Sequence, residues 1–135
     1  MTRKITKNDA VKMLNKAIDT KGQDGYNYVY KDEFEACRYT NGDMENPVGQ
    51  CIVGQAFVNE GFQMWQKNPF RGVDKDPIEG PITSQLVVFA EENDIEFTEG
   101  AKLVFVVAQT VQDGGGTWGV AVDAARTGAA ATNLD

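Results

Sequence analysis

The two cysteines, Cys37 and Cys51, bracket a turn-rich stretch, "CRYTNGDMENPVGQCIVGQAF". Such a pair could form part of a metal site, a reactive thiol or a disulfide, or it could be structural. Two cysteines alone cannot complete a four-ligand zinc site, and a cytosolic disulfide would be reduced. A reactive thiol needs a lowered pKa, but Arg38, next to Cys37, would point to the opposite face of a strand. We therefore favour small buried core residues in a strand, turn and helix, with a pair close in space as the alternative.

The remaining residue types offer no complete catalytic set. The sequence has no histidine, which excludes Ser-His, Cys-His and His-metal arrangements within this chain. The glycine-rich segment 112–119, "QDGGGTWG", lacks the lysine of a phosphate-binding loop and is expected to connect two helices. Acidic pairs such as Asp74 and Asp76 lack a calcium-loop pattern and are interpreted as surface charge. We predict a protein that is not an enzyme, with no metal and no cofactor.

The N-terminal third predicts a helix followed by a β-hairpin. Residues 6–22 carry an apolar stripe at helical spacing, with Thr6 as N-cap and Asp9 completing a capping box. The alternating tyrosines of 26–30 predict a strand, and 35–40 predicts a second one, joined by a short loop.

A second helix is predicted over 46–61. Asn46 is its expected N-cap, and Pro47 fits the first helical position, where a missing N–H costs nothing. Gly49 and Gly54 are unfavourable inside a helix, each by about 1 kcal/mol relative to alanine. Their presence predicts close packing against another backbone, which we expect to be the hairpin.

The second half predicts one long loop and three helices. Residues 62–82 hold three of the four prolines and show no clear period, so an irregular loop is expected. Helices are predicted over 83–94, 97–116 and 117–128, with the β-branched run near 103–107 leaving a buried strand open. The expected N-caps are Thr83 or Ser84, Thr98 and Thr117, and the expected last stop is Gly128.

These elements predict a mostly helical α+β fold: a helix, a short antiparallel hairpin, then about four helices in one compact domain. The domain is expected to span 1–128, with 129–135 as a flexible tail. Cys37, Cys51, Gly54 and Trp118 are the expected structural residues, with Trp118 on the inward face of the last helix.

Two groups of side chains are candidates for binding. Within 62–82, Met64, Trp65, Phe70 and Arg71 could form a contact surface for a partner protein, since aromatic residues and arginine are enriched in interface cores. The competing interpretation is a loop strapped across the core.

Tyr26, Tyr28 and Tyr30 would share one face of the first predicted strand. Such a face could stack a base, while helix N-termini could bind phosphate. The tyrosines are therefore the candidate ligand-stacking residues.

Charge is unevenly distributed along the chain. The net charge is −7, with +3 in residues 1–30, −4 in 31–60, −5 in 61–100 and −1 in 101–135. An acidic protein repels phosphate, so direct binding of nucleic acid is not expected. No apolar run approaches the roughly 20 residues of a membrane-spanning helix, and the N-terminus carries no leader pattern. We expect a cytoplasmic protein, and the sequence leaves homo-oligomer formation open.

Four strings carry a family resemblance: "YVY" (28–30), "CRYTNG" (37–42), "QCIVGQAF" (50–57) and "FTEGAKLVFVVAQTVQDGGGTWGVAVDAA" (97–125). In this order the chain resembles a family of small uncharacterised proteins encoded by tailed phages of actinobacteria, among them mycobacteriophages. The resemblance covers about 60 residues and contains no catalytic signature. Relatives often have Pro-Ser before the second cysteine and a histidine after Val-Gly, where this chain has Gly49-Gln50 and Gln55. Any chemistry of that histidine is absent here.

The resemblance implies an accessory protein that acts in the cytoplasm of the infected bacterial host. Such proteins commonly bind host machinery or blunt host defence. Our leading hypothesis is therefore a non-enzymatic binder of a host protein. The second is a binder of a small molecule, such as a nucleotide defence signal, and the third is an enzyme with Cys37 or Cys51 as its nucleophile.

Overall fold

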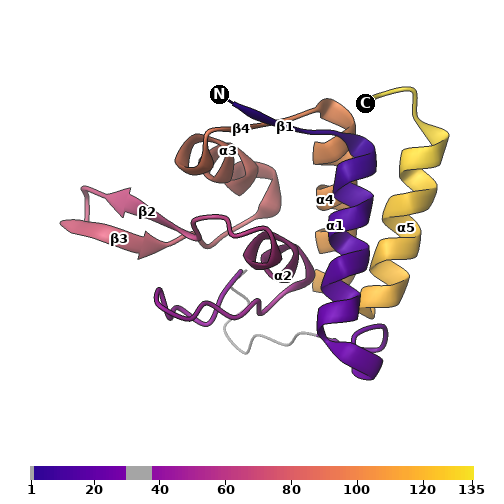
Figure 1. Cartoon of the computed structure of the whole chain (residues 1–135), viewed down its shortest axis with the longest axis horizontal. Helices are drawn as coiled ribbons and strands as arrows, with labels where there is room; N and C mark the ends of the chain where they lie inside the picture. The colour runs from indigo at the N-terminus through magenta and orange to yellow at the C-terminus, as the bar shows by residue number, and fades with distance from the viewer. Residues whose placement is uncertain (1, 30–37) are drawn as a thin grey trace.

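The computed structural model describes residues 2–29 and 38–135. These residues form a mostly helical α+β fold, which confirms the predicted class (Figure 1). The elements are β1 (Arg3–Ile5), α1 (Lys7–Thr20), the 3-10 helix η1 (Gly22–Asp24), α2 (Ile52–Asn59), β2 (Trp65–Asn68), β3 (Val73–Pro77), α3 (Ile82–Asn93), β4 (Ile95–Phe97), α4 (Glu99–Asp113) and α5 (Trp118–Ala131).

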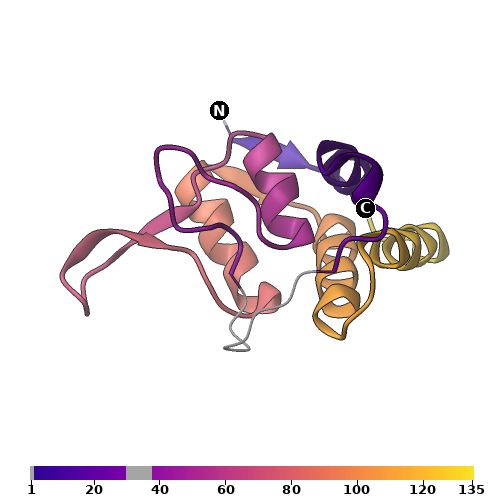
Figure 2. The ribbon, with the colours of Figure 1, turned by 90° about the horizontal axis from the view of Figure 1, so that it is seen from below.

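The helices α1, α4 and α5 lie side by side at one end of the molecule (Figures 1 and 2). Helix α2 packs on α1 and α4, and α3 packs on α4. The strands β1 and β4 form a parallel pair, with Arg3 opposite Ile95 and Ile5 opposite Phe97. Neither strand was predicted, because three residues are too few to show a period.

A cluster of phenylalanines forms the centre of the core. The ring of Phe57, on α2, contacts four other rings with centroid separations between 4.8 and 5.8 Å. Those rings belong to Phe62, Phe89, Phe97 and Phe105. Each edge-to-face or stacked pair adds roughly 0.5–1.5 kcal/mol beyond the burial of its area. The cluster therefore joins α2, α3, β4 and α4 into one core.

Three of the predicted helix starts are confirmed. Thr6 caps α1, and its side chain and that of Asp9 exchange hydrogen bonds with each other's backbone N–H in a capping box. Thr98 caps α4 and Thr117 caps α5. The β-branched run at 103–107 lies inside α4, so the alternative of a buried strand is wrong.

Helix α2 is shorter than predicted. It begins after Cys51, whose thiol accepts a hydrogen bond from the Gly54 N–H, so Asn46 is not its N-cap. The preceding segment is held as a loop, since the Asn41 side chain accepts from the backbone N–H groups of Asp43 and Val48. Such side-chain bonds offer the backbone an alternative to the helix.

Two predicted helix ends also differ. Helix α3 begins at Ile82 after Pro81, and neither Thr83 nor Ser84 caps it; the Ser84 hydroxyl donates to the Pro81 carbonyl instead. Helix α5 continues through Gly128 to Ala131. Gly128 is not among the glycines with positive φ, the conformation that a helix-ending glycine adopts, so the helix passes through it.

The predicted N-terminal hairpin is wrong where it can be compared. Residues 26–29 form turns and loop rather than a strand, and Arg38 and Thr40 make only isolated bridges, to Glu79 and Gly49. The rest of both predicted strands, 30 and 35–37, lies outside the described residues.

Residues 62–82 contain an antiparallel hairpin where an irregular loop was predicted. The strands β2 and β3 pair with Trp65 opposite Pro77 and Gln66 opposite Asp76, and a bulge follows Gln66. Gly72 closes the turn at φ +65°, a conformation that side chains disfavour. The bulge, together with Pro69 in the turn and Pro77 at the end of β3, disturbs the alternation that normally identifies a strand.

Candidate functional site

The β2–β3 hairpin projects from the helical body in both views, and we call residues 65–77 the arm (Figures 1 and 2). Phe70 lies in the turn at its tip and is 99% exposed. Its neighbours Pro69 and Arg71 are also exposed. A fully exposed phenylalanine at the end of a projecting hairpin is the most conspicuous apolar feature of the described surface.

The root of the arm is anchored in the core. Met64 is 2% exposed, and its carbonyl accepts a hydrogen bond of 2.9 Å from the Ile78 N–H. Ile78 is also buried. The sequence grouped Met64 with Trp65, Phe70 and Arg71, but the structure separates this core residue from the exposed tip.

One face of the arm combines an aromatic ring with two lysines. Trp65 is half-buried, and the Lys75 ammonium lies 5.8 Å from the centroid of its ring. An open pocket of about 340 Å³ lies over this face. It is lined by Gln63, Trp65, Lys67, Asp74, Lys75 and Glu92.

Polar contacts brace the other face of the arm. Asp76 accepts a hydrogen bond of 2.9 Å from the Asn68 side-chain amide and forms a 3.1 Å ion pair with Arg71. The Arg71 side chain is 67% exposed, so this pair adds little stability. Its effect is to hold Arg71 across the turn, beside Phe70.

Tyr26 and Tyr28 do not form a shared stacking face. Tyr26 donates a 3.0 Å hydrogen bond to Asp123, which raises the pKa of Tyr26. The ring of Tyr28 packs edge-on against Trp118 at 4.8 Å, and Lys21 lies over it. The backbone carbonyls of both tyrosines accept hydrogen bonds from the first turn of α5. Tyr30 lies outside the described residues.

The pocket beside Tyr26, between α1 and α5, encloses about 380 Å³. Its charged lining residues are Asp19, Asp123 and Arg126. Asp123 and Arg126 form an ion pair at 2.8 Å, which leaves a net negative lining. Such a pocket disfavours an anionic ligand.

The predicted structural residues that can be placed lie in the core. Cys51 and Trp118 are fully buried. A side chain at Gly54 would place its Cβ 2.0 Å from the carbonyl oxygen of Tyr39, so the predicted close approach of two backbones is confirmed. Cys37 lies outside the described residues.

A buried polar network was missed by sequence reasoning. The side-chain oxygens of Gln112 and Gln109 accept from the Ile52 and Val53 N–H groups of α2, at 2.9 and 3.4 Å. Their side-chain amides donate to Asp113. Burial raises the pKa of Asp113, and the hydrogen bond from Gln109 opposes that rise.

This network caps α2 from another helix. The first N–H groups of a helix have no partner within it, and here two glutamines of α4 supply the acceptors. The Q-x-x-Q spacing places both side chains on one helix face, which was the available signal. The arrangement supports the fold and offers no reacting group.

Within 2–29 and 38–135, no group of three or more His, Cys, Asp or Glu side chains could hold a metal ion. In the same part of the chain, no helix is long and apolar enough to cross a membrane. No family model, curated protein or solved structure matches the chain.

Proposed function

We propose that this protein is a small acidic phage accessory protein that binds a host protein in the host cytoplasm and catalyses no reaction. The observation that supports the proposal best is Phe70, which is 99% exposed at the tip of the arm. Keeping a phenylalanine in water forgoes roughly 1.5–3 kcal/mol that its burial would provide. An interface that buries Phe70 would recover this energy.

The construction of the arm fits a binding element. Buried Met64 fixes its root, and the paired strands β2 and β3 order the arm up to the turn. An anchor that is already ordered loses less conformational entropy on binding. Aromatic residues and arginine also dominate interface hot spots, and Phe70 and Arg71 are adjacent in the turn.

The contacts of other candidate residues weigh against the two competing hypotheses. Tyr26 and Tyr28 are already engaged with α5, and the pocket beside Tyr26 has a negative lining. Cys51 is fully buried, where a substrate could not reach its thiol without rearrangement of the core.

The test is affinity capture from the cytoplasm of the actinobacterial host, with mass spectrometry of the proteins retained. The variants are Phe70→Ala and a matched control, Val87→Ala, since Val87 is 56% exposed on α3. We expect one stoichiometric host protein to be retained by the wild type and by Val87→Ala. Phe70→Ala should retain about tenfold less, since loss of a hot-spot side chain costs at least roughly 1.4 kcal/mol.

Circular dichroism of each variant confirms that it remains folded. Equal capture by Phe70→Ala and the wild type would remove Phe70 as the anchor. A wild-type preparation that retains no stoichiometric protein would contradict the binding function itself.

A further inference from the structure

The face of the arm that carries Trp65, Lys67 and Lys75 has a chemistry distinct from that of the tip. Lys67 and Lys75 line the same pocket as Trp65, and the Lys75 ammonium lies over the Trp65 ring. Both lysines are exposed. The face is thus an aromatic surface flanked by two cations.

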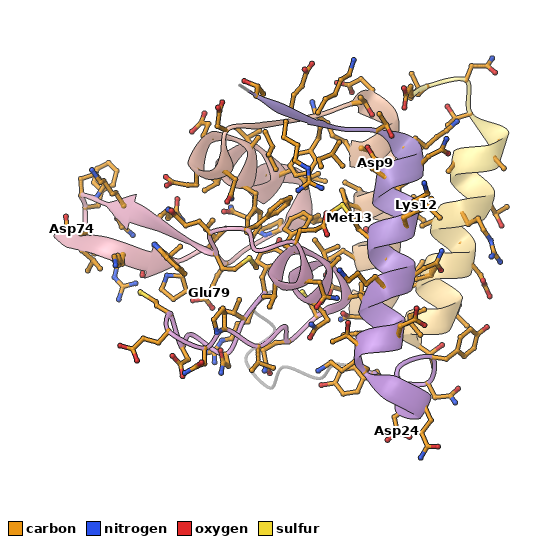
Figure 3. The ribbon with its side chains drawn as sticks, viewed as in Figure 1. Asp9, Lys12, Met13, Asp24, Asp74 and Glu79 are labelled. Carbon is orange, nitrogen blue, oxygen red and sulfur yellow. The ribbon has the colours of Figure 1, made fainter. Side chains whose placement is uncertain are left out.

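Neither lysine is neutralised by an ion pair in the described structure. Two carboxylates also line the pocket over this face, Asp74 and Glu92. Glu92 accepts a 3.0 Å hydrogen bond from the Gln63 side chain, and Asp74 lies at the outer end of the arm (Figure 3). The two carboxylates balance the two lysines in formal charge. Among the described residues, however, no carboxylate lies within ion-pair distance of Lys67 or Lys75, so both ammonium groups remain available to an incoming carboxylate.

The charge of the arm is opposite to that of the body. The arm has a formal charge of +1, from Lys67, Arg71 and Lys75 against Asp74 and Asp76. Since the whole chain has a net charge of −7, the rest of the chain has a net charge of −8. The net charge of the body repels a negatively charged partner and that of the arm does not, and the arm projects away from the body (Figure 2).

We propose that the Trp65–Lys67–Lys75 face binds an acidic segment of the partner protein, with carboxylates at the two lysines and an apolar side chain on the Trp65 ring. The proposal rests on the proposed function, because it describes a second contact made by the same arm. Phe70 would supply the apolar anchor, and this face would select partners with acidic residues beside the anchor's pocket.

A protein segment fits this face better than a nucleic acid does. Binding to nucleic acid rests on neutralising many phosphates, and each contact adds to the affinity. Here only two unpaired lysines are available, and a long polyanion would extend over the −8 body. A short acidic segment can remain on the arm, and its apolar side chains gain from contact with Trp65.

The test uses the full chain and a fluorescein-labelled synthetic peptide of alternating glutamate and valine, with binding measured by fluorescence anisotropy at low salt. A glutamine–valine peptide and a labelled single-stranded oligothymidylate serve as reference probes. The variant is Lys67→Gln/Lys75→Gln. The matched control is Lys12→Gln/Lys16→Gln. It changes the net charge equally, on exposed positions of α1, a helix that lies at the opposite end of the molecule from the arm (Figure 1).

We expect the wild type to bind the glutamate peptide more tightly than either reference probe. Lys67→Gln/Lys75→Gln should weaken that binding about fivefold or more, as expected for the loss of two exposed charge pairs. Lys12→Gln/Lys16→Gln should leave it unchanged. The proposal is overturned by equal binding of the two peptides, by tighter binding of the oligonucleotide, or by equal weakening in both double variants.

The two proposals can fail separately. If the lysines do not affect peptide binding but Phe70→Ala still loses the host protein, then the host-binding function stands and the acidic segment does not. If peptide binding depends on the lysines but Phe70→Ala retains the host protein, then the acidic-segment site stands without the Phe70 anchor.

Discussion

At the scale of single residues, Gly54 shows a backbone contact overriding helix propensity. Alanine would be better than glycine in an isolated helix by about 1 kcal/mol. In this fold a Cβ at Gly54 would lie 2.0 Å from the Tyr39 carbonyl oxygen. The glycine therefore permits α2 to pack directly on the backbone of the preceding segment.

We predict that Gly54→Ala lowers the free energy of unfolding by about 1–3 kcal/mol, the usual cost of overpacking. The control is Gly128→Ala, also inside a helix but with open space around it. That change should raise the free energy of unfolding by roughly 0.5–1 kcal/mol. Urea denaturation followed by circular dichroism measures both. A Gly54→Ala protein as stable as the wild type would contradict the contact with Tyr39.

Asp113 predicts a dependence of stability on pH. Burial raises the pKa of Asp113 above its ordinary value of 3.8, so the folded protein binds this proton more tightly than the unfolded chain does. Ionisation of Asp113 therefore costs stability. The cost is absent well below pH 3.8 and is fully present above the pKa of the folded state.

We predict that Asp113→Asn gains stability relative to the wild type as the pH rises, because it keeps an acceptor for Gln109 and Gln112 without a charge. The difference in free energy of unfolding should be larger at neutral pH than below pH 3.8. Asp113→Ala, which removes the acceptor, should lose roughly 1–3 kcal/mol at both. An equal Asn effect at both pH values would show that ionisation of Asp113 carries no cost.

At the scale of elements, the arm is separable from the core. Its strands contact mainly each other, while Met64 and Ile78 keep their own backbone hydrogen bond below it. Trp65 and Pro77 lie opposite each other where the arm leaves the body. A short turn could therefore close the chain between them.

We predict that replacing residues 66–76 by a short glycine-containing turn changes the free energy of unfolding by less than about 1 kcal/mol, the range of surface changes. Capture of the host protein should be lost completely. Urea denaturation and affinity capture test the two halves of this prediction. A variant that fails to fold would show that the arm supports the core.

At the scale of the whole molecule, one core connects the α-helices α1 to α5. The buried residues run from Ile5 on β1 to Ala129 on α5 without division. Asp135 extends these connections, since its backbone and side chain accept hydrogen bonds from the N–H groups of Gly100 and Lys7. Elements that share one core unfold together.

We predict a single cooperative unfolding transition. In a Trp65→Phe variant, fluorescence reports only Trp118, which is buried against Tyr28. Its urea midpoint should coincide with that of the far-ultraviolet circular dichroism. A fluorescence transition at lower urea would indicate that α5 and its contacts separate before the rest of the core.

The sequence by itself determined the local features of this protein. Thr6, Thr98 and Thr117 identify helix starts because a cap acts within three residues of itself, and Gly54 signals a close approach because glycine is otherwise unfavourable in a helix. Composition alone also excludes some functions: the absence of histidine excludes histidine-based catalytic and metal sites within this chain, and the net charge of −7 disfavours nucleic-acid binding.

Only the tertiary structure decided the features that need contacts between residues far apart in the sequence. The β1–β4 pairing joins residues far apart in sequence, and Gln109 and Gln112 gain their role only because α2 lies against α4. The same holds for the candidate site: Met64 and Phe70 look alike as apolar loop residues, yet one is buried and the other is 99% exposed. Burial depends on the neighbours that the fold supplies, and local spacing does not encode them.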